Sequence, residues 1–174
     1  MEELVLELQN DSLKENAFKK LVQQYQKPLY FHIRKYVHQH EDANDILQNT
    51  FIKVWNAINQ FKGECSLYTW LYKIAGNESI TFINKNKKHL AENIENTNIT
   101  KSANSSIDDA HLIEEKLAFA LAQLPDKQKQ VFILRYYDEM PYEQMSEILE
   151  TSIGALKASY HHAAKKIETI ILSI

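Results

Sequence analysis

Only three glycines, Gly63, Gly76 and Gly154, occur among the 174 residues of this chain. Tight hairpin turns and loops that cradle phosphates both depend on glycine, so the shortage argues against a β-sheet protein and a glycine-rich nucleotide site. Apolar residues make up 44% of the chain, which is enough for a hydrophobic core and excludes a wholly disordered protein. The sequence therefore predicts an all-α fold.

The cysteine content and the N-terminus favour a cytoplasmic location. Cys65 is the only cysteine and cannot form an internal disulfide, and the N-terminal segment MEELVLELQN carries acids where a signal peptide carries lysines. No stretch approaches the roughly eighteen consecutive apolar residues that a transmembrane helix needs. We therefore expect no membrane insertion.

A polar segment divides the chain. Residues 86–109 read NKKHLAENIENTNITKSANSSIDD, rich in Asn, Ser and Thr, with aliphatic residues at no helical spacing. This composition predicts a flexible linker, set at 89–109, between an N-terminal helical domain at 1–88 and a C-terminal domain at 110–174. A linker of this length would allow the two domains to lie far apart.

Three segments of the first domain repeat apolar residues at third- or fourth-residue spacing, which predicts three amphipathic helices. These segments are 21–36, 47–58 and 67–82. Pro28 lies inside the first pattern and predicts a kink or a restart. Ser66 precedes the third pattern and is a good N-cap residue.

The second domain ends in a pattern typical of a helix-turn-helix. Pro125 and Pro141 each open a short helix, and after a break at ETSIG a longer helix follows. That last helix carries Lys157, His161 and Lys165 along one face, opposite its apolar stripe. Cations on such a helix suit phosphate contacts beside a DNA groove. A plain helical hairpin with a solvated face produces the same pattern, so spacing alone leaves both interpretations open.

The charge distribution limits how this chain could bind nucleic acid alone. Residues 1–90 hold 12 basic and 10 acidic side chains, a balance of +2, whereas residues 91–174 hold 8 and 13, a balance of -5. Free-standing nucleic-acid binders usually carry a basic excess. Any DNA function here relies on local patches or on a partner that supplies the positive field.

Two further surfaces in the first domain each allow a functional and a structural interpretation. Aromatic residues at 68–82, among them Trp70, alternate with lysines, which suits the stacking of unpaired bases, although Trp70 and Phe82 also fit a core. One stripe of the second predicted helix mixes an acid, two amides and an aliphatic residue, which suits either a protein-docking face or solvated surface. It consists of Asp45, Gln48, Asn49 and Ile52.

The histidines do not form a recognisable catalytic or metal motif. His38 and His40 lie beside Glu41 and Asp42, and His161 and His162 are adjacent, but neither group has HExxH spacing or a cysteine partner. No local pattern indicates a catalytic triad. We expect no metal, no cofactor, no small-molecule substrate and no enzymatic activity.

Several long segments, in order, resemble a bacterial RNA polymerase sigma factor of the small extracytoplasmic-function group. The resemblance runs from about Phe18 to Ile167. Segment 42–55, DANDILQNTFIKVW, resembles the polymerase-docking helix, and segment 61–77, FKGECSLYTWLYKIAGN, resembles the strand-opening loop and promoter-reading helix. Segments 124–149 and 152–168 resemble the C-terminal helix-turn-helix domain.

The resemblance implies a transcription initiation factor whose partners are core RNA polymerase and promoter DNA, both as duplex and as melted nontemplate strand. An anti-sigma factor is a further partner that it allows. Polymerase binding would fall to Asp45, Gln48, Asn49 and Ile52. The minus-ten element would contact Phe61, Lys62, Gly63, Glu64, Ser66, Trp70, Lys73 and Asn77. The minus-thirty-five element would contact Ser152, Ala155, Lys157, Ala158, Ser159, His161, His162 and Lys165.

Some positions depart from the family pattern. Asn44 and Asn49 stand where many relatives carry acids, and Glu150 replaces a common turn glycine. Ser159, His162 and Ala164 stand where arginines are common, which weakens guanidinium readout of guanine. Gly76 replaces a larger residue beside Asn77.

Two alternative functions remain open from the sequence. The first is a free-standing helix-turn-helix transcriptional regulator, whose first domain senses a signal or dimerises and which needs no polymerase. The second is a hydrolase that uses His38, His40 and the neighbouring acids. Association with core RNA polymerase separates the sigma factor from both.

Overall fold

The structure, a computed structural model, describes residues 2–93 and 109–173. All regular elements in these ranges are helical, which confirms the predicted all-α fold with two helical domains. The elements are α1 (Glu2–Leu8), α2 (Lys14–Arg34), α3 (His40–Ala57), η1 (Ile58–Gln60), α4 (Leu67–Asn93), α5 (Asp109–Ala122), α6 (Asp126–Phe132), η2 (Ile133–Tyr137), α7 (Tyr142–Leu149) and α8 (Ile153–Ser173). The predicted linker, 89–109, overlaps the end of α4, and residues 94–108 lie outside the described ranges.

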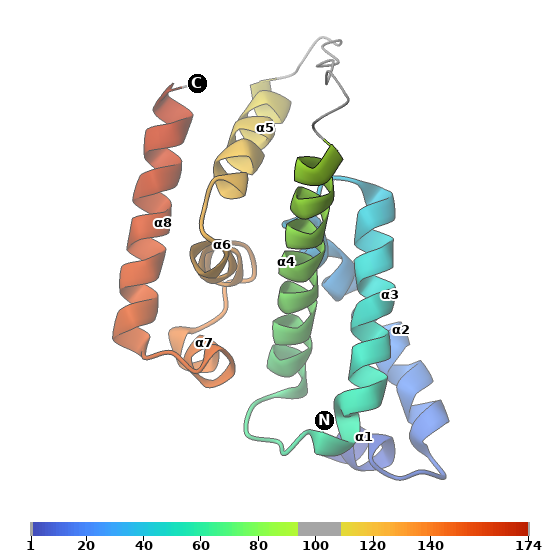
Figure 1. Cartoon of the computed structure of the whole chain (residues 1–174). Coiled ribbons are helices and arrows are strands. Elements are labelled where there is room, and N and C mark those ends of the chain that lie inside the picture. Colours follow the sequence, from blue (N-terminus) through green and yellow to red (C-terminus); the bar gives the residue numbers. More distant parts are fainter. Residues whose placement is uncertain (1, 94–108, 174) are drawn as a thin grey trace.

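In the first domain, α2, α3 and α4 pack against one another, with α1 beside α2 (Figure 1). The Thr69 backbone N–H donates to Ser66 Oγ at 3.1 Å, so Ser66 caps α4 as its position predicted. Of the two outcomes predicted at Pro28, a kink or a restart, the restart is wrong, because α2 is one continuous helix from Lys14 to Arg34. Pro28 is exposed, so water can bond the backbone carbonyl that its missing N–H leaves free.

In the second domain, α8 packs against α5, α6 and α7 (Figure 1). Pro125 and Pro141 precede α6 and α7, and their carbonyl oxygens accept the N–H groups of Lys129 at 2.9 Å and Met145 at 3.0 Å. Each proline thus starts a helix where its own missing N–H costs nothing. Helices α7 and α8, joined by a short turn at 150–152, form the helix-turn-helix.

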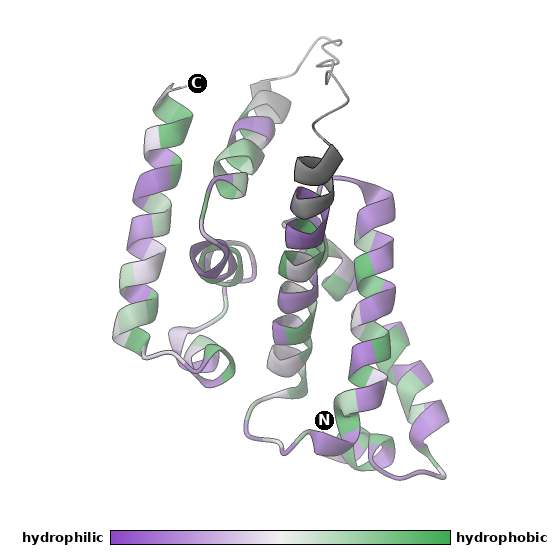
Figure 2. Ribbon diagram, viewed as in Figure 1, coloured by the Kyte–Doolittle hydropathy of each residue, from purple (hydrophilic) through white to green (hydrophobic). Residues whose placement is uncertain are grey.

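The two domains share one apolar core. Figure 2 shows hydrophilic and hydrophobic residues interleaved along α3 and α8, as expected for helices with one buried face. Residues of the second domain belong to the same buried cluster as α2 and α4, namely Val131, Ile133, Leu134, Met140, Met145, Ile148 and Leu156. A smaller cluster, which includes Leu121, Phe132 and Ile167, joins α5, α6 and α8. The domains that the linker would allow to separate are therefore packed together here.

No helix in the described ranges combines the length and the apolar character that crossing a membrane requires.

Candidate functional site

The stripe of α3 singled out from the sequence forms one exposed face. Asp45, Gln48 and Asn49 are exposed, and Ile52 exposes 52% of its surface between them. The opposite face carries Ala43, Ile46, Thr50 and Val54 into the core. Because the core holds the other side of α3, the exposed face is presented on a fixed helix, as a protein-docking surface requires.

The loop between η1 and α4 forms one wall of a groove of about 500 Å³. The ring centroids of Phe61 and Trp70 lie 5.0 Å apart. Gly63 adopts φ 75°, a left-handed conformation that favours glycine. The groove is lined by Gln60, Phe61, Lys62, Glu64, Cys65, Trp70, Lys73, Glu147, Ile148 and Glu150. The structure thus places an aromatic pair and two lysines around one opening.

Trp70 has features of both interpretations, a ring available for base stacking and a core residue. Its side chain is half-buried, packs against the main core and also lines the groove. Phe61 is almost fully buried and packs against the Trp70 ring. Lys62, Gly63, Glu64 and Ser66 are exposed, so the loop presents a mixed polar surface beside the aromatic pair. Phe82, the other aromatic residue in question, packs against the core.

Lys73 and Asn77 extend this surface along α4, and both have partners in the second domain. Lys73 Nζ lies 3.2 Å from Glu150 Oε1, and Gln130 Nε2 donates to Asn77 Oδ1 at 3.1 Å. Glu150 itself adopts φ 51°, the left-handed conformation that explains why a glycine is favourable at this turn. Of the predicted minus-ten residues, five line the groove, namely Phe61, Lys62, Glu64, Trp70 and Lys73, whereas Gly63, Ser66 and Asn77 are not among its lining residues. Lys73 and Asn77 contact the second domain.

The candidate reading face of α8 is exposed over its N-terminal half. Ala155, Lys157, Ala158, His161, His162 and Lys165 are exposed, while Leu156, Ala163 and Ile167 are buried on the opposite side. Ser159 is half-buried, and exposed Ser152 accepts the Ala155 N–H on Oγ at 3.3 Å, which caps the helix. Seven of the eight residues that the resemblance implies for the minus-thirty-five element are thus exposed, and Ser159 is the exception.

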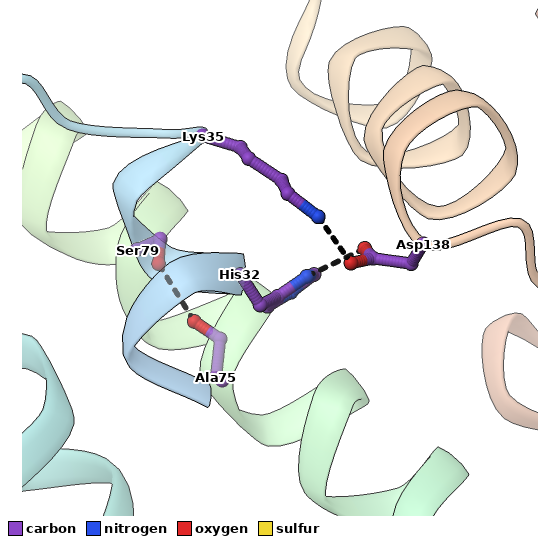
Figure 3. A network of polar contacts seen from close by, with 5 residues as sticks. All are labelled: His32, Lys35, Ala75, Ser79 and Asp138. Atoms are coloured by element: carbon purple, nitrogen blue, oxygen red, sulfur yellow. Dashed lines mark hydrogen bonds and ion pairs between the residues drawn. The ribbon is translucent and has the colours of Figure 1, made fainter. Parts of the chain in front are cut away.

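A buried polar cluster joins the domains, and sequence reasoning missed it. Asp138 Oδ2 lies 2.6 Å from His32 Nδ1, and Asp138 Oδ1 lies 2.5 Å from Lys35 Nζ (Figure 3). His32 is fully buried, and the Asp138 side chain is only 4% exposed. His32 continues the apolar stripe of Leu21, Tyr25 and Leu29, a signal that could have marked it as a buried histidine in need of a partner.

The electrostatics of the cluster favour an ionised Asp138. Burial alone would raise the pKa of the Asp138 carboxyl, but the hydrogen bonds and charges of His32 and Lys35 outweigh it and hold that pKa below its ordinary value. Nearby, burial together with the Asp138 charge raises the pKa of the Tyr36 hydroxyl. Asp138 is therefore an ionised carboxylate that lies between His32 and Lys35.

The histidine groups show no metal-binding arrangement in the described parts of the chain, where no three His, Cys, Asp or Glu side chains gather suitably. His40 instead contacts the hydroxyl of Tyr30, and His38 is exposed. The ring centroids of His161 and His162, both exposed on α8, lie 6.0 Å apart.

Two family models match the chain in the order of its domains. Sigma-70 region 2 matches residues 21–89, and Sigma-70 region 4 matches residues 114–167. The chain is 30% identical over 166 residues to the ECF RNA polymerase sigma-E factor of Haemophilus influenzae. This alignment covers 89% of this chain and 87% of the relative. It is 28% identical over 157 residues to the RNA polymerase sigma factor YlaC of Bacillus subtilis, and this alignment covers 88% of this chain and 91% of YlaC.

Solved structures share the fold. CnrH in complex with the cytosolic domain of CnrY matches with a TM-score of 0.70 and 19% identity, covering 98% of this chain and 96% of CnrH. The sigma factor RpoE of Bartonella quintana, in complex with the anti-sigma factor NepR, matches with a TM-score of 0.66 and 22% identity. The match covers 88% of this chain and 96% of the Bartonella chain. Because both sigma-70 regions match in order and the relatives align over nearly their whole length, the chain belongs to the extracytoplasmic-function group of bacterial RNA polymerase sigma factors.

Proposed function

We propose that this protein binds core RNA polymerase through α3, captures melted minus-ten DNA at the groove and reads the minus-thirty-five element with α8. The observation that carries the proposal is the placement of three candidate surfaces on three different elements. The exposed face of α3, the groove beside α4 and the exposed face of α8 are each held by the core. Such an arrangement suits one protein that makes three separate contacts.

The minus-ten step needs a place for an unstacked base. Removing a base from its stack costs on the order of a few kcal/mol, which a fitted pocket with aromatic stacking can offset. Trp70, supported by Phe61, offers a ring at the groove, and Lys62 and Lys73 offer cations for the adjoining phosphates. Strand opening would thus use binding energy and no nucleotide hydrolysis.

The minus-thirty-five step would rely on small side chains and isolated cations. Ala155, Ala158 and Ser159 allow α8 to approach base edges closely, whereas Lys157 and Lys165 provide point charges suited to phosphates. Without arginines on this face, guanine readout is weaker than in a helix that carries them.

The net charge argues against the free-standing regulator. The chain carries a formal charge of -3, so duplex DNA gains little electrostatic attraction from the protein alone. Core polymerase would supply that field in the complex. An anti-sigma factor is a further candidate partner, since the Bartonella relative was solved with one.

Copurification tests the proposal. The tagged chain is expressed in its source organism, and the retained subunits are identified by mass spectrometry, with Asp45→Arg as a variant of the docking face. We expect the polymerase subunits to be retained by the wild type and lost from the variant. Tight, promoter-specific DNA binding by the purified chain at physiological salt, with no polymerase retained, would support the free-standing regulator instead.

A further inference from the structure

Lys129, on α6, is a buried cation without an acidic partner. The residue is only 4% exposed, yet its ammonium takes part in none of the ion pairs between described residues. Lysine is almost never fully buried unless an opposite charge pairs with it, because burial removes the hydration of the ammonium group. The position is therefore suited to an anion that does not come from the described part of the chain.

One hydrogen bond between the domains locates Lys129 relative to α4. Asn84 Nδ2, on α4, donates to Asp126 Oδ2, on α6, at 2.8 Å. Lys87 follows Asn84 by three residues and Lys129 follows Asp126 by three, so each lysine shares a helix face with one of the bonded residues. The two lysines, one from each domain, therefore flank the same contact.

The charges beside this contact are mostly positive. Burial lowers the pKa of the Lys129 ammonium, and the positive charge of Lys87 lowers it further. The Asp126 carboxylate raises that pKa and has the smallest effect of the three, and its Oδ2 already accepts the Asn84 amide. Because Lys87 is exposed, it presents a positive charge to an anion that approaches from solution.

The Lys129 ammonium reaches solvent although the residue as a whole is buried. Among the described side chains, the fully enclosed polar atoms without a hydrogen-bond partner are His32 Nε2 and Tyr36 Oη. Lys129 Nζ also lacks a partner and is not one of these enclosed atoms, so it keeps some contact with water. An anion can thus reach the ammonium while both helices stay folded.

We propose that Lys129 and Lys87 form a binding site for inorganic phosphate, or for the phosphate group of a small molecule, where α4 meets α6. Phosphate oxygens accept hydrogen bonds from two ammonium groups at once, and lysine binds phosphate as a point charge. A compact anion fits better than a nucleic-acid backbone, because the flanking sugars and bases hinder approach to a residue that is 4% exposed. Neither lysine belongs to the surfaces assigned to polymerase or promoter DNA, so the inference does not rest on the proposed function.

A phosphate at this site would contact both domains. It would offset the unfavourable charge of Lys129 on α6 and, through Lys87, attach that helix more firmly to α4. A ligand that binds only the folded protein stabilises it in proportion to the logarithm of its concentration above the dissociation constant. The stability of this chain would therefore depend on the concentration of a phosphate compound.

Titration calorimetry of the full chain with inorganic phosphate tests the site, at neutral pH and with ionic strength held constant by sodium chloride. Lys129→Met keeps an unbranched apolar side chain and removes the ammonium, and Lys127→Met removes an exposed ammonium from the same helix. We expect one phosphate per wild-type chain, an affinity at least tenfold lower in Lys129→Met, and an unchanged affinity in Lys127→Met. Equal affinity of wild type and Lys129→Met, or no saturable binding by the wild type, would overturn the site.

Thermal unfolding shows whether a loss of binding reflects a damaged fold. In chloride alone, Lys129→Met should unfold at the wild-type temperature or above it, because the substitution removes a buried charge without a partner. Phosphate should then raise the unfolding temperature of the wild type and of Lys127→Met more than that of Lys129→Met. An equal rise in all three proteins would reduce the phosphate effect to a general salt effect and overturn the site.

Two further comparisons test the second lysine and the source of the phosphate. Lys87→Met should lower phosphate affinity several-fold, whereas Lys85→Met, also exposed on α4, should not. Equal losses would overturn the assignment of Lys87. A single-stranded oligonucleotide with hydroxyl ends offers only phosphodiesters and should not displace inorganic phosphate from the wild type. Displacement by the oligonucleotide would make the site a nucleic-acid contact and overturn the small-molecule assignment.

Discussion

Gln130 packs so closely against Gly76 that a methyl group on Gly76 would lie 3.2 Å from Gln130 Nε2. The same methyl would lie 3.0 Å from the Tyr36 hydroxyl oxygen. Gly76 is buried in α4, and Gln130 comes from α6 in the other domain. The close approach of the two domains therefore depends on the missing side chain at position 76, one of the departures from the family pattern.

Gly76→Val should weaken the contact between the domains by about 1–3 kcal/mol, because a branched side chain overfills a packed site. We expect the wild type to unfold in one cooperative transition in scanning calorimetry, and Gly76→Val to broaden this transition or divide it into two. Gly154→Val is the matched control, since nothing lies within 4 Å of the Cβ it would add. An equal effect of the two substitutions would contradict the close fit at Gly76.

Asp45→Arg should abolish binding to core polymerase while changing the free energy of unfolding by less than about 0.5 kcal/mol, because Asp45 is exposed. Affinity for core is measured by competition with a labelled sigma factor, and stability by urea unfolding. Asp11→Arg, an exposed charge reversal in the turn before α2, is the control. Normal competition by Asp45→Arg would remove α3 from the docking surface.

Acid should weaken the contribution of Asp138 to stability. Because its native pKa lies below the ordinary value of about 3.9, ionised Asp138 stabilises the fold above that ordinary pKa. The contribution is lost as pH falls through the lower native pKa. The difference in free energy of unfolding between wild type and Asp138→Asn, about 2 kcal/mol at neutral pH, should therefore shrink between pH 5 and pH 2, as measured by urea unfolding at each pH. A constant difference over that range would contradict an ionised Asp138.

Lys157→Ala and Lys165→Ala should each weaken promoter binding by the holoenzyme without changing base preference. An ammonium contacts phosphate as a point charge, so each loss should lower the salt-dependence slope by about 0.9. Binding is measured on a set of minus-thirty-five variants at several salt concentrations, with exposed Lys19→Ala on α2 as the control. A changed base preference with an unchanged slope would show that these lysines read bases.

The fold was predictable from the sequence where local physics determines it. Ser66 caps α4, and Pro125 and Pro141 start helices, because these residues act through their own backbone and nearest neighbours. The helix restart predicted at Pro28 does not occur, because a proline on the exposed side of a long helix is tolerated when the core holds both ends.

The candidate surfaces were predictable as faces, and the interface was not. The exposed stripes of α3 and α8 follow from helical periodicity, which fixes which side chains share a face. The contact of Asp138 with His32 joins residues 106 positions apart, and no periodic pattern encodes such a pairing. The sequence also left the function of Trp70 open, because a half-buried ring serves both a core and a groove.

We expect this chain to let core polymerase melt promoter DNA at the minus-ten groove. Permanganate reactivity of unpaired thymines, mapped over genomic fragments with core polymerase, measures that step directly. The wild type should create defined melted segments that are absent with core alone, and Trp70→Ala should lose most of them while still binding core. Melted segments of the same extent with Trp70→Ala, or none with the wild type bound to core, would contradict melting at this groove.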